Sequence, residues 1–236
     1  MNKLQIFLLL FIIIFFPLIS YSGEHIFLRE EFNDLSNWNP LNFPKIKRHT
    51  IYTIESNGEE RYLKAESDAS ASGIIYKKEF NIYESPKIKW RWRVENIYKK
   101  GDVKTKEGDD YPIRVYVAFK YNPEKATFSE KLKYNAARLL YGEYPPYSAI
   151  SYIWSSKEYP EKVFTSRYTD RAKMVLLEQG SANIGKWKTE EVNIIDDYKA
   201  AFGENPPSVA TIAIMNDSDN TGEKGISYVD YIEVYR

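Results

Sequence analysis

Short runs of alternating apolar residues recur along most of this chain and constrain its fold more than any other feature. The runs are rich in β-branched and aromatic residues and are bounded by Gly, Pro, Asn or Asp. This pattern is typical of β-strands separated by turns. Eleven strands are predicted, and eleven are too many for one flat sheet, so we expect two packed sheets. The predicted strands are 26–32, 50–54, 62–65, 73–80, 87–94, 113–119, 149–154, 172–179, 187–194, 209–215 and 226–235.

Two segments break the period of two and predict short helices. Within 129–141, apolar residues recur every three or four positions, and Gly142 can end the helix; they are Leu132, Ala136, Leu139 and Leu140. A second helix is expected over 196–202, because Asp196 and Asp197 favour the positive end of a helix dipole and Gly203 follows. Neither an internal repeat nor a Pro-, Gly- or Ser-rich linker divides the chain, so we expect one domain over 23–236.

The N-terminus has the features of a signal peptide. Lys3 precedes an apolar run over 4–19, and Ser20 and Ser22 supply the small residues of a peptidase site. The alternative is an uncleaved anchor, but the run is shorter than the roughly 20 residues that span a bilayer. We therefore expect a signal peptide over 1–22, export to a bacterial periplasm or beyond, and no stable membrane insertion after cleavage.

Charge and cysteine content exclude several classes of function. The 33 basic and 33 acidic residues leave no net charge to attract a phosphate backbone or an anionic membrane, so nucleic acid is not an expected partner. Without cysteine the chain has neither disulfides nor thiolate chemistry. His25 and His49, its two histidines, fit no zinc motif.

Charged residues on predicted strands give the first candidate site. In 87–94 strict alternation places apolar residues on one face and cations, including Arg91 and Arg93, on the other. Asp109 and Asp110 lead into a strand whose outward face carries Arg114 and Tyr116.

A guanidinium pairs with a carboxylate through two parallel hydrogen bonds, so these arginines can hold either the aspartates or an acidic ligand group. Asp230 lies among apolar strand residues and needs a partner, which an arginine can supply. A binding site and a structural ion network both remain open at this point.

The segment after the strand at 209–215 predicts a cation site. Asp217, Asp219 and Asn220 form an oxygen-rich loop, and calcium is the expected ion. The twelfth position of an EF-hand loop would be Tyr228 and not Glu, which excludes that motif. The alternative is a turn whose Asx side chains bond their own backbone.

Tyr152 and Trp154 share one face of a predicted strand. They can form a platform on which a sugar ring stacks, or they can pack in the core.

Several motifs, in this order along the chain, resemble the bacterial family DUF3047. They are Ser70-Ala71-Ser72-Gly73, Trp90-Arg91-Trp92-Arg93-Val94, Gly108-Asp109-Asp110, Tyr152-Ile153-Trp154, Phe202-Gly203-Glu204 and Asp217-Ser218-Asp219-Asn220-Thr221. The resemblance spans nearly all of the chain after the apolar run. It implies an exported protein of the periplasm and carries over no established activity.

The sequence as a whole predicts a mostly β, two-sheet β-sandwich of the jelly-roll or galactose-binding-like kind. The leading functional hypothesis is an exported protein that binds a carbohydrate or cell-envelope glycan, with calcium as a cofactor. Two alternatives are a glycan hydrolase that uses two carboxylates as acid and base, and a purely structural envelope protein.

Overall fold

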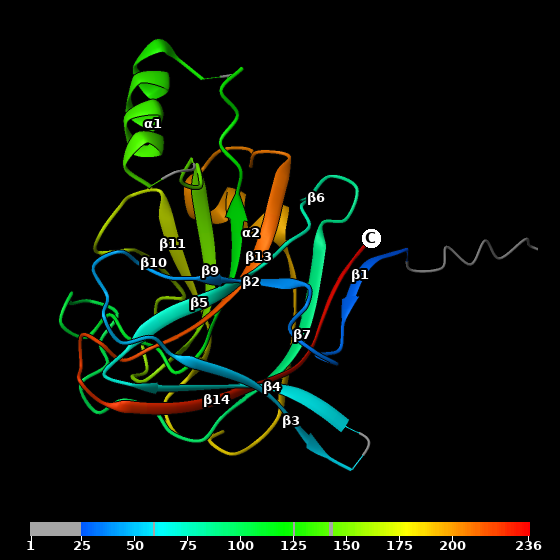
Figure 1. Ribbon diagram of the computed structural model, residues 1–236, viewed down its shortest axis with the longest axis vertical. Coiled ribbons are helices and arrows are strands. Elements are labelled where there is room, and N and C mark those ends of the chain that lie inside the picture. The colour runs from blue at the N-terminus through cyan, green and yellow to red at the C-terminus, as the bar shows by residue number, and fades with distance from the viewer. Residues whose placement is uncertain (1–24, 59, 125, 142–143) are drawn as a thin grey trace, which may run out of the picture.

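The computed structural model describes residues 25–58, 60–124, 126–141 and 144–236, which form two packed β-sheets with two helices (Figure 1). The six-stranded sheet has the order β12-β7-β14-β4-β3, with β1 paired to β14. Its strands are β1 (Ile26–Glu30), β3 (Ile51–Asn57), β4 (Glu60–Asp68), β7 (Lys87–Val94), β12 (Lys188–Asn193) and β14 (Lys224–Tyr235).

The eight-stranded sheet has the order β10-β11-β9-β8-β13-β5-β2, with β6 paired to β13. Its strands are β2 (Trp38–Leu41), β5 (Ala71–Tyr76), β6 (Phe80–Asn81), β8 (Arg114–Phe119), β9 (Ser148–Ser155), β10 (Val163–Thr165), β11 (Ala172–Gln179) and β13 (Val209–Asp217). The predicted two-sheet β-sandwich is confirmed. The predicted signal peptide, 1–22, lies outside the described residues.

The core lies between the two sheets and follows the predicted alternation. Trp90 and Trp92 of β7 are fully buried and contact the rings of Tyr152 and Trp154 of β9, with centroids 5.3 and 6.0 Å apart respectively. Tyr152 and Trp154 are themselves fully buried. They are core residues and present no ring face to a ligand, which corrects the proposal that they form a sugar-stacking platform.

Both predicted helices are present, at α1 (Phe128–Tyr141) and α2 (Ile194–Phe202). Helix α2 begins two residues earlier than predicted because the Asn193 side chain accepts hydrogen bonds from the backbone N–H groups of Ile195 and Asp196. Gly203 ends α2 in the left-handed conformation, with φ of 73°. No helix within the described part of the chain has both the length and the apolar character needed to cross a membrane.

Sequence analysis missed the short strands β2 and β10. Strand β2 has the sequence Trp-Asn-Pro-Leu, and its proline cannot donate to a ladder. Both lie at an edge of the eight-stranded sheet, where a single neighbour defines the strand.

Candidate functional site

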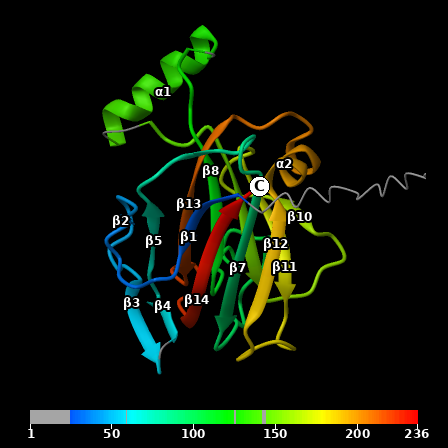
Figure 2. The ribbon, with the colours of Figure 1, turned by 90° about the vertical axis from the view of Figure 1, so that its right-hand side faces the viewer.

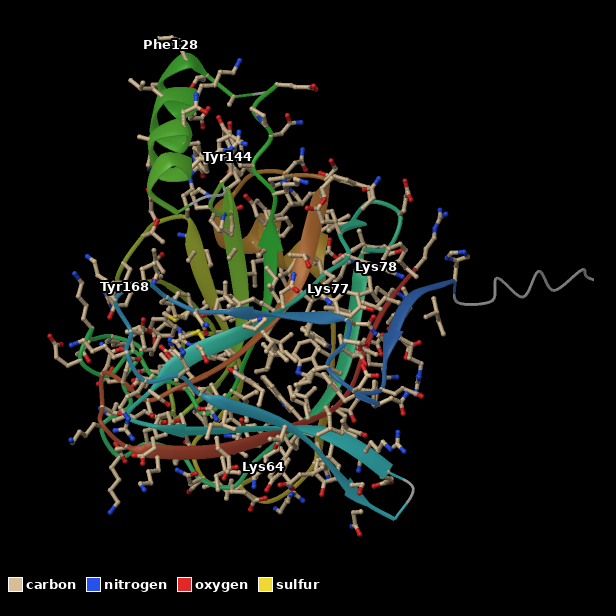
Figure 3. The ribbon with its side chains drawn as sticks, viewed as in Figure 1. Lys64, Lys77, Lys78, Phe128, Tyr144 and Tyr168 are labelled. Carbon is tan, nitrogen blue, oxygen red and sulfur yellow. The ribbon has the colours of Figure 1, made fainter. Side chains whose placement is uncertain are left out.

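A groove runs over the outer face of the eight-stranded sheet. Its floor consists of residues of β8 and β13 whose side chains point away from the core, among them Ala118 and Ala213. The groove has a volume of about 520 Å³, within the usual range of ligand sites. Aromatic residues from three separate segments line it, among them Phe43, Tyr116, Tyr121 and Tyr144. Tyr144 lies beside α1 in Figure 3, which places this end of the groove next to that helix.

Tyr116 lies in the floor of the groove. Burial raises the pKa of its hydroxyl to about 12, so the hydroxyl is protonated at neutral pH. The hydroxyl lies 3.8 Å from the sulfur of Met215, a weak acceptor. Lys120, Glu79 and Thr211 add polar groups to the lining. The groove thus combines aromatic faces with groups that can donate and accept hydrogen bonds.

A buried acidic cluster continues the same sheet face beyond Tyr116. Tyr116 and Arg114 are two residues apart on β8, and Met215 and Asp217 are two apart on β13, so each pair shares a face. The Arg114 guanidinium binds Asp217 through Nε, at 2.9 Å, and through a short Nη2 contact. Its Nη2 also donates to the backbone carbonyl of Asp109, at 2.8 Å.

Three carboxylates of this cluster face one another. One oxygen each from Asp110, Asp217 and Asp219 lie within 4.8 Å of one another. The Asp110 carboxylate accepts backbone hydrogen bonds from Asn220, at 3.3 Å, and Thr221, at 2.6 Å, which closes the loop after β13. Asp110 and Asp217 are buried, whereas Asp219 is half-buried.

The electrostatics of the cluster favour uptake of positive charge. Counted as formal charges, the carboxylates of Asp109, Asp110, Asp217 and Asp219 are four negative and the Arg114 guanidinium is one positive, a net of three negative. Burial, together with the neighbouring carboxylates, raises the pKa of Asp217 to about 7 although Arg114 opposes the shift. Burial also raises the pKa of Asp110. The cluster can therefore bind a proton or a cation near neutral pH.

A buried polar network holds the loop of the cluster in place. Asn216, which precedes Asp217, is fully buried and donates from Nδ2 to the carbonyl of Ala65 and to the hydroxyl of Ser227, both at 3.1 Å. Its Oδ1 accepts from the Tyr98 hydroxyl at 3.1 Å. Asn216 thus connects the end of β13 to the six-stranded sheet, which fixes the position of Asp217.

The structure divides the predicted charged site into two places. Asp109, Asp110 and Arg114 meet in the acidic cluster. Arg91, Arg93 and Asp230 lie on the outer face of the six-stranded sheet.

On that other face, Arg91 Nη1 binds Asp230 Oδ2 at 2.9 Å, as the sequence predicted for an arginine. Arg93 binds Glu95 at 2.9 Å. Each guanidinium also lies 5.0 Å from the ring of Trp187. The expectation that all these charges form one site is therefore wrong.

The structure changes one member of the predicted cation site. Asp217 and Asp219 belong to the acidic group, and Asp110 is its third member. The Asn220 side-chain amide donates to the Tyr168 hydroxyl, at 3.2 Å. Sequence analysis also missed Phe43, Tyr121 and Tyr144 of the groove, because they come from segments outside the predicted strands. In the sequence, the alternation that places Tyr116 on an outward face was the one indication of the groove.

Fold and site together define a β-sandwich protein with a groove on one sheet face and an acidic cluster at its end. The chain belongs to the family described as "Protein of unknown function (DUF3047)", whose model matches residues 36–233. This confirms the resemblance seen in the motifs. No curated protein matches the sequence.

Several solved structures resemble this one, and all three of the following have low sequence identity to it. A family 11 carbohydrate-binding module of a cellulosomal cellulase from Clostridium thermocellum is 13% identical, covers 91% of this chain and 95% of its own, and has a TM-score of 0.42. The xyloglucanase domain of NopAA from Sinorhizobium fredii, in complex with cellobiose, is 11% identical, with 84% and 91% covered and a TM-score of 0.46. Lectin I-B4 from Griffonia simplicifolia is 11% identical, with 86% and 94% covered and a TM-score of 0.40.

Proposed function

We propose that this is an exported carbohydrate-binding protein of the bacterial periplasm whose ligand is a cell-envelope glycan. The observation that carries the proposal is the groove on the eight-stranded sheet, with aromatic residues in its lining and alanines beside Tyr116 in its floor. The apparent signal peptide, predicted from the sequence, supports export.

The chemistry of a sugar ring suits this groove. A pyranose has an apolar C–H face, which packs against an aromatic ring, and a rim of hydroxyl groups that need hydrogen-bond partners. Tyr116 and Tyr144 supply ring faces. Lys120 and Glu79 form an exposed ion pair at 2.8 Å in the lining, and they can supply a donor and an acceptor. Alanines in the floor leave room for a flat ring to approach the sheet.

The proposal includes a calcium ion held by Asp110, Asp217 and Asp219. Calcium takes oxygen ligands at about 2.3–2.6 Å, so oxygens on opposite sides of the ion lie about 5 Å apart. The separations of up to 4.8 Å in the acidic group fit that size. The net negative charge of the cluster favours a divalent cation, and Arg114 offsets part of it. The ion would rigidify the end of the sheet face that carries Tyr116.

Carboxylate pairing favours binding over glycan hydrolysis. Asp217 is engaged by Arg114, Asp110 by two backbone N–H groups, and Asp230 by Arg91. An acid and base pair needs carboxyl groups that face one open cleft. The groove beside the cluster likewise favours a ligand-binding protein over a purely structural one.

Glycan binding is tested by affinity electrophoresis in gels that contain soluble β-glucan or solubilised peptidoglycan fragments. The wild type should be retarded in at least one of them, and Tyr116→Ala should lower its affinity about tenfold or more because a stacking face is lost. Tyr62→Ala is the matched control, a half-buried tyrosine on the outer face of the six-stranded sheet. Equal retardation of the two variants, or none of the wild type with either glycan, would refute the proposal.

Calcium binding is tested by thermal denaturation with calcium and with a chelator. Calcium should raise the Tm of the wild type but not that of Asp219→Ala, whose half-buried side chain can be removed with little effect on folding. Asp230→Ala, on the other sheet, should keep the full shift. A wild-type Tm that does not respond to the chelator and to added calcium excludes the ion without excluding the groove.

A further inference from the structure

Helix α1 carries an apolar stripe that faces away from the rest of the protein. Phe128, Leu132 and Ala136 recur every fourth residue and therefore lie on one side of the helix. Phe128 is 84% exposed and Leu132 66% exposed, and Ala136 is exposed as well. The spacing that predicted this helix is normally the mark of a core-facing surface. Here the stripe points into solvent.

The opposite side of α1 fixes this orientation. Tyr134 is two residues after Leu132, about 200° around the helix, and it is buried. Its ring stacks on Tyr121 with centroids 3.7 Å apart, and its hydroxyl is 3.3 Å from the carbonyls of Pro146 and Tyr147. Rotation of the stripe toward the sheet would break all of these contacts.

Hydrogen bonds also stabilise the first turn of α1. Glu130 accepts from the backbone N–H of Thr127 at 2.8 Å, and the Thr127 hydroxyl accepts from the Glu130 N–H at 3.3 Å. This capping box makes the helix a formed element and not a frayed extension.

Positive charge accompanies the stripe. Lys131 and Lys133 flank Leu132, each about 100° around the helix from it, whereas Arg138 lies one turn after Tyr134, on the opposite side of the helix. Glu130 is the acidic residue of α1 and is occupied by the cap. Three cations and one acid leave a local excess of two positive charges. The balanced charge of the whole chain predicted no attraction to an anionic surface, but this helix has a local charge of its own.

We infer that α1 docks on an anionic lipid surface, with Phe128 and Leu132 inserted among the headgroups and acyl ends. An interfacial helix needs an apolar face flanked by Lys or Arg, and long basic side chains can reach the headgroups while their stems stay apolar. A stable protein interface buries about 800 Å² on each partner, more than two large side chains provide. The helix stands at one end of the molecule in Figure 1 and Figure 2, so it can reach a surface without interference from the sheets.

Docking through α1 would place the groove beside the lipid. Tyr121, which stacks on Tyr134, and Tyr144, which lies 5.0 Å from the Arg138 guanidinium, both line the groove. The inference stands independently of what the groove binds.

The test uses the absence of cysteine from the chain, which allows one fluorescent label at a chosen position. Ala136→Cys places an environment-sensitive dye on the stripe, and Ser56→Cys places it at the exposed hairpin of β3 and β4, at the far end of the molecule (Figure 1). The full chain is mixed with phosphatidylcholine vesicles, or with vesicles of equal parts phosphatidylcholine and phosphatidylglycerol.

We expect a blue shift, and quenching by lipid-borne quenchers, for the Ala136→Cys label on anionic vesicles and not for the Ser56→Cys label. Adding Leu132→Glu should abolish the shift, and Lys131→Gln should weaken binding about fivefold. The N-terminal apolar run is present in every variant, so a difference between them is due to α1.

Three results would overturn the inference: no shift at residue 136, an equal shift at residue 56, or a shift that Leu132→Glu leaves unchanged. A shift that occurs without vesicles and grows with protein concentration would instead assign the stripe to self-association. Because Leu132 is exposed, Leu132→Glu should leave the Tm unchanged, and this separates loss of docking from loss of folding.

Discussion

The two outer faces of the sandwich carry the same kinds of residue in opposite environments. On the six-stranded sheet, Arg91 and Asp230 form an ion pair whose side chains are 33% and 20% exposed. On the eight-stranded sheet, Arg114 and Asp217 form a pair whose side chains are 8% and 2% exposed. A pair that is partly open to solvent contributes little to stability, whereas a buried pair cannot lose one partner without a large cost. The two faces therefore differ in how far their ion pairs are shielded from solvent, and not in the types of residue that they carry.

The loop that precedes β8 shields the Arg114–Asp217 pair from solvent. Tyr111 packs with Val103 over Met174 and Leu176, on the outward side of β11. The Arg114 guanidinium lies 4.3 Å from the Tyr111 ring. The corresponding face of the six-stranded sheet has half-buried rings such as Trp187, and its charges remain partly in water. A charged pair under a loop and beside a groove is therefore a stronger candidate for function than a pair on an open sheet.

The largest expected effect is from Arg114→Met. The change leaves Asp217 buried beside Asp109 and Asp110 without its cation, so the free energy of unfolding should fall by about 3–5 kcal/mol. Arg91→Met is the matched control and should cost at most about 2 kcal/mol, since Asp230 is partly solvated and the lost Trp187 contact is modest. Urea denaturation of both variants measures the difference.

Equal losses for these two variants would show that the faces do not differ as their exposure indicates. Arg114→Lys sharpens the result, because it keeps the charge but loses the two-point contact with Asp217. Its loss should lie between those of the wild type and Arg114→Met.

A smaller effect is expected from pH. Burial raises the pKa of Asp217 to about 7, above the value of about 3.9 in an unfolded chain. The folded chain then holds this proton more tightly, so the contribution to stability is fully present below pH ~4 and is lost as pH rises through ~7.

In chelator, the free energy of unfolding should fall between pH 5 and 8 by up to about 1.4 kcal/mol per pH unit for the one proton involved. The slope should be reduced in Asp217→Asn and unchanged in Asp230→Asn. Calcium, which favours the ionised form, should flatten the slope of the wild type. If the wild type and Asp217→Asn have equal slopes, the pKa of Asp217 is not raised in the folded protein.

The sequence predicted the sandwich well because its strands alternate strictly. In β7 the parity of Trp90 and Arg91 alone assigns one side chain to the core and the other to the outside. The same parity placed both Arg91 and Arg114 on outer faces. It carries no information about which sheet a strand joins, and β7 and β8 join different sheets. That is why one predicted charged site became two.

Contacts between residues far apart in the sequence explain the other errors of the sequence analysis. Asp110 reaches the loop after β13 across 111 positions, through its bond to Thr221, and no local pattern encodes that contact. In α1, spacing identified the helix but not its orientation, which depends on the contact of Tyr134 with Tyr121. Local periodicity determines secondary structure and sidedness, whereas the site depends on which loops cover which sheet face.

The smallest expected effect is from Asp230→Asn. Its partner Arg91 keeps partial contact with water and with Trp187, so the free energy of unfolding should change by less than about 1 kcal/mol. Moderate salt should shrink that change, because salt screens exposed charges more than buried ones. Urea denaturation at low and high salt, with Asp217→Asn in parallel, measures both. If Asp230→Asn proves as costly and as insensitive to salt as Asp217→Asn, the pair on the six-stranded sheet is as well protected from solvent as the cluster, and the basis for placing the site on the eight-stranded sheet alone is removed.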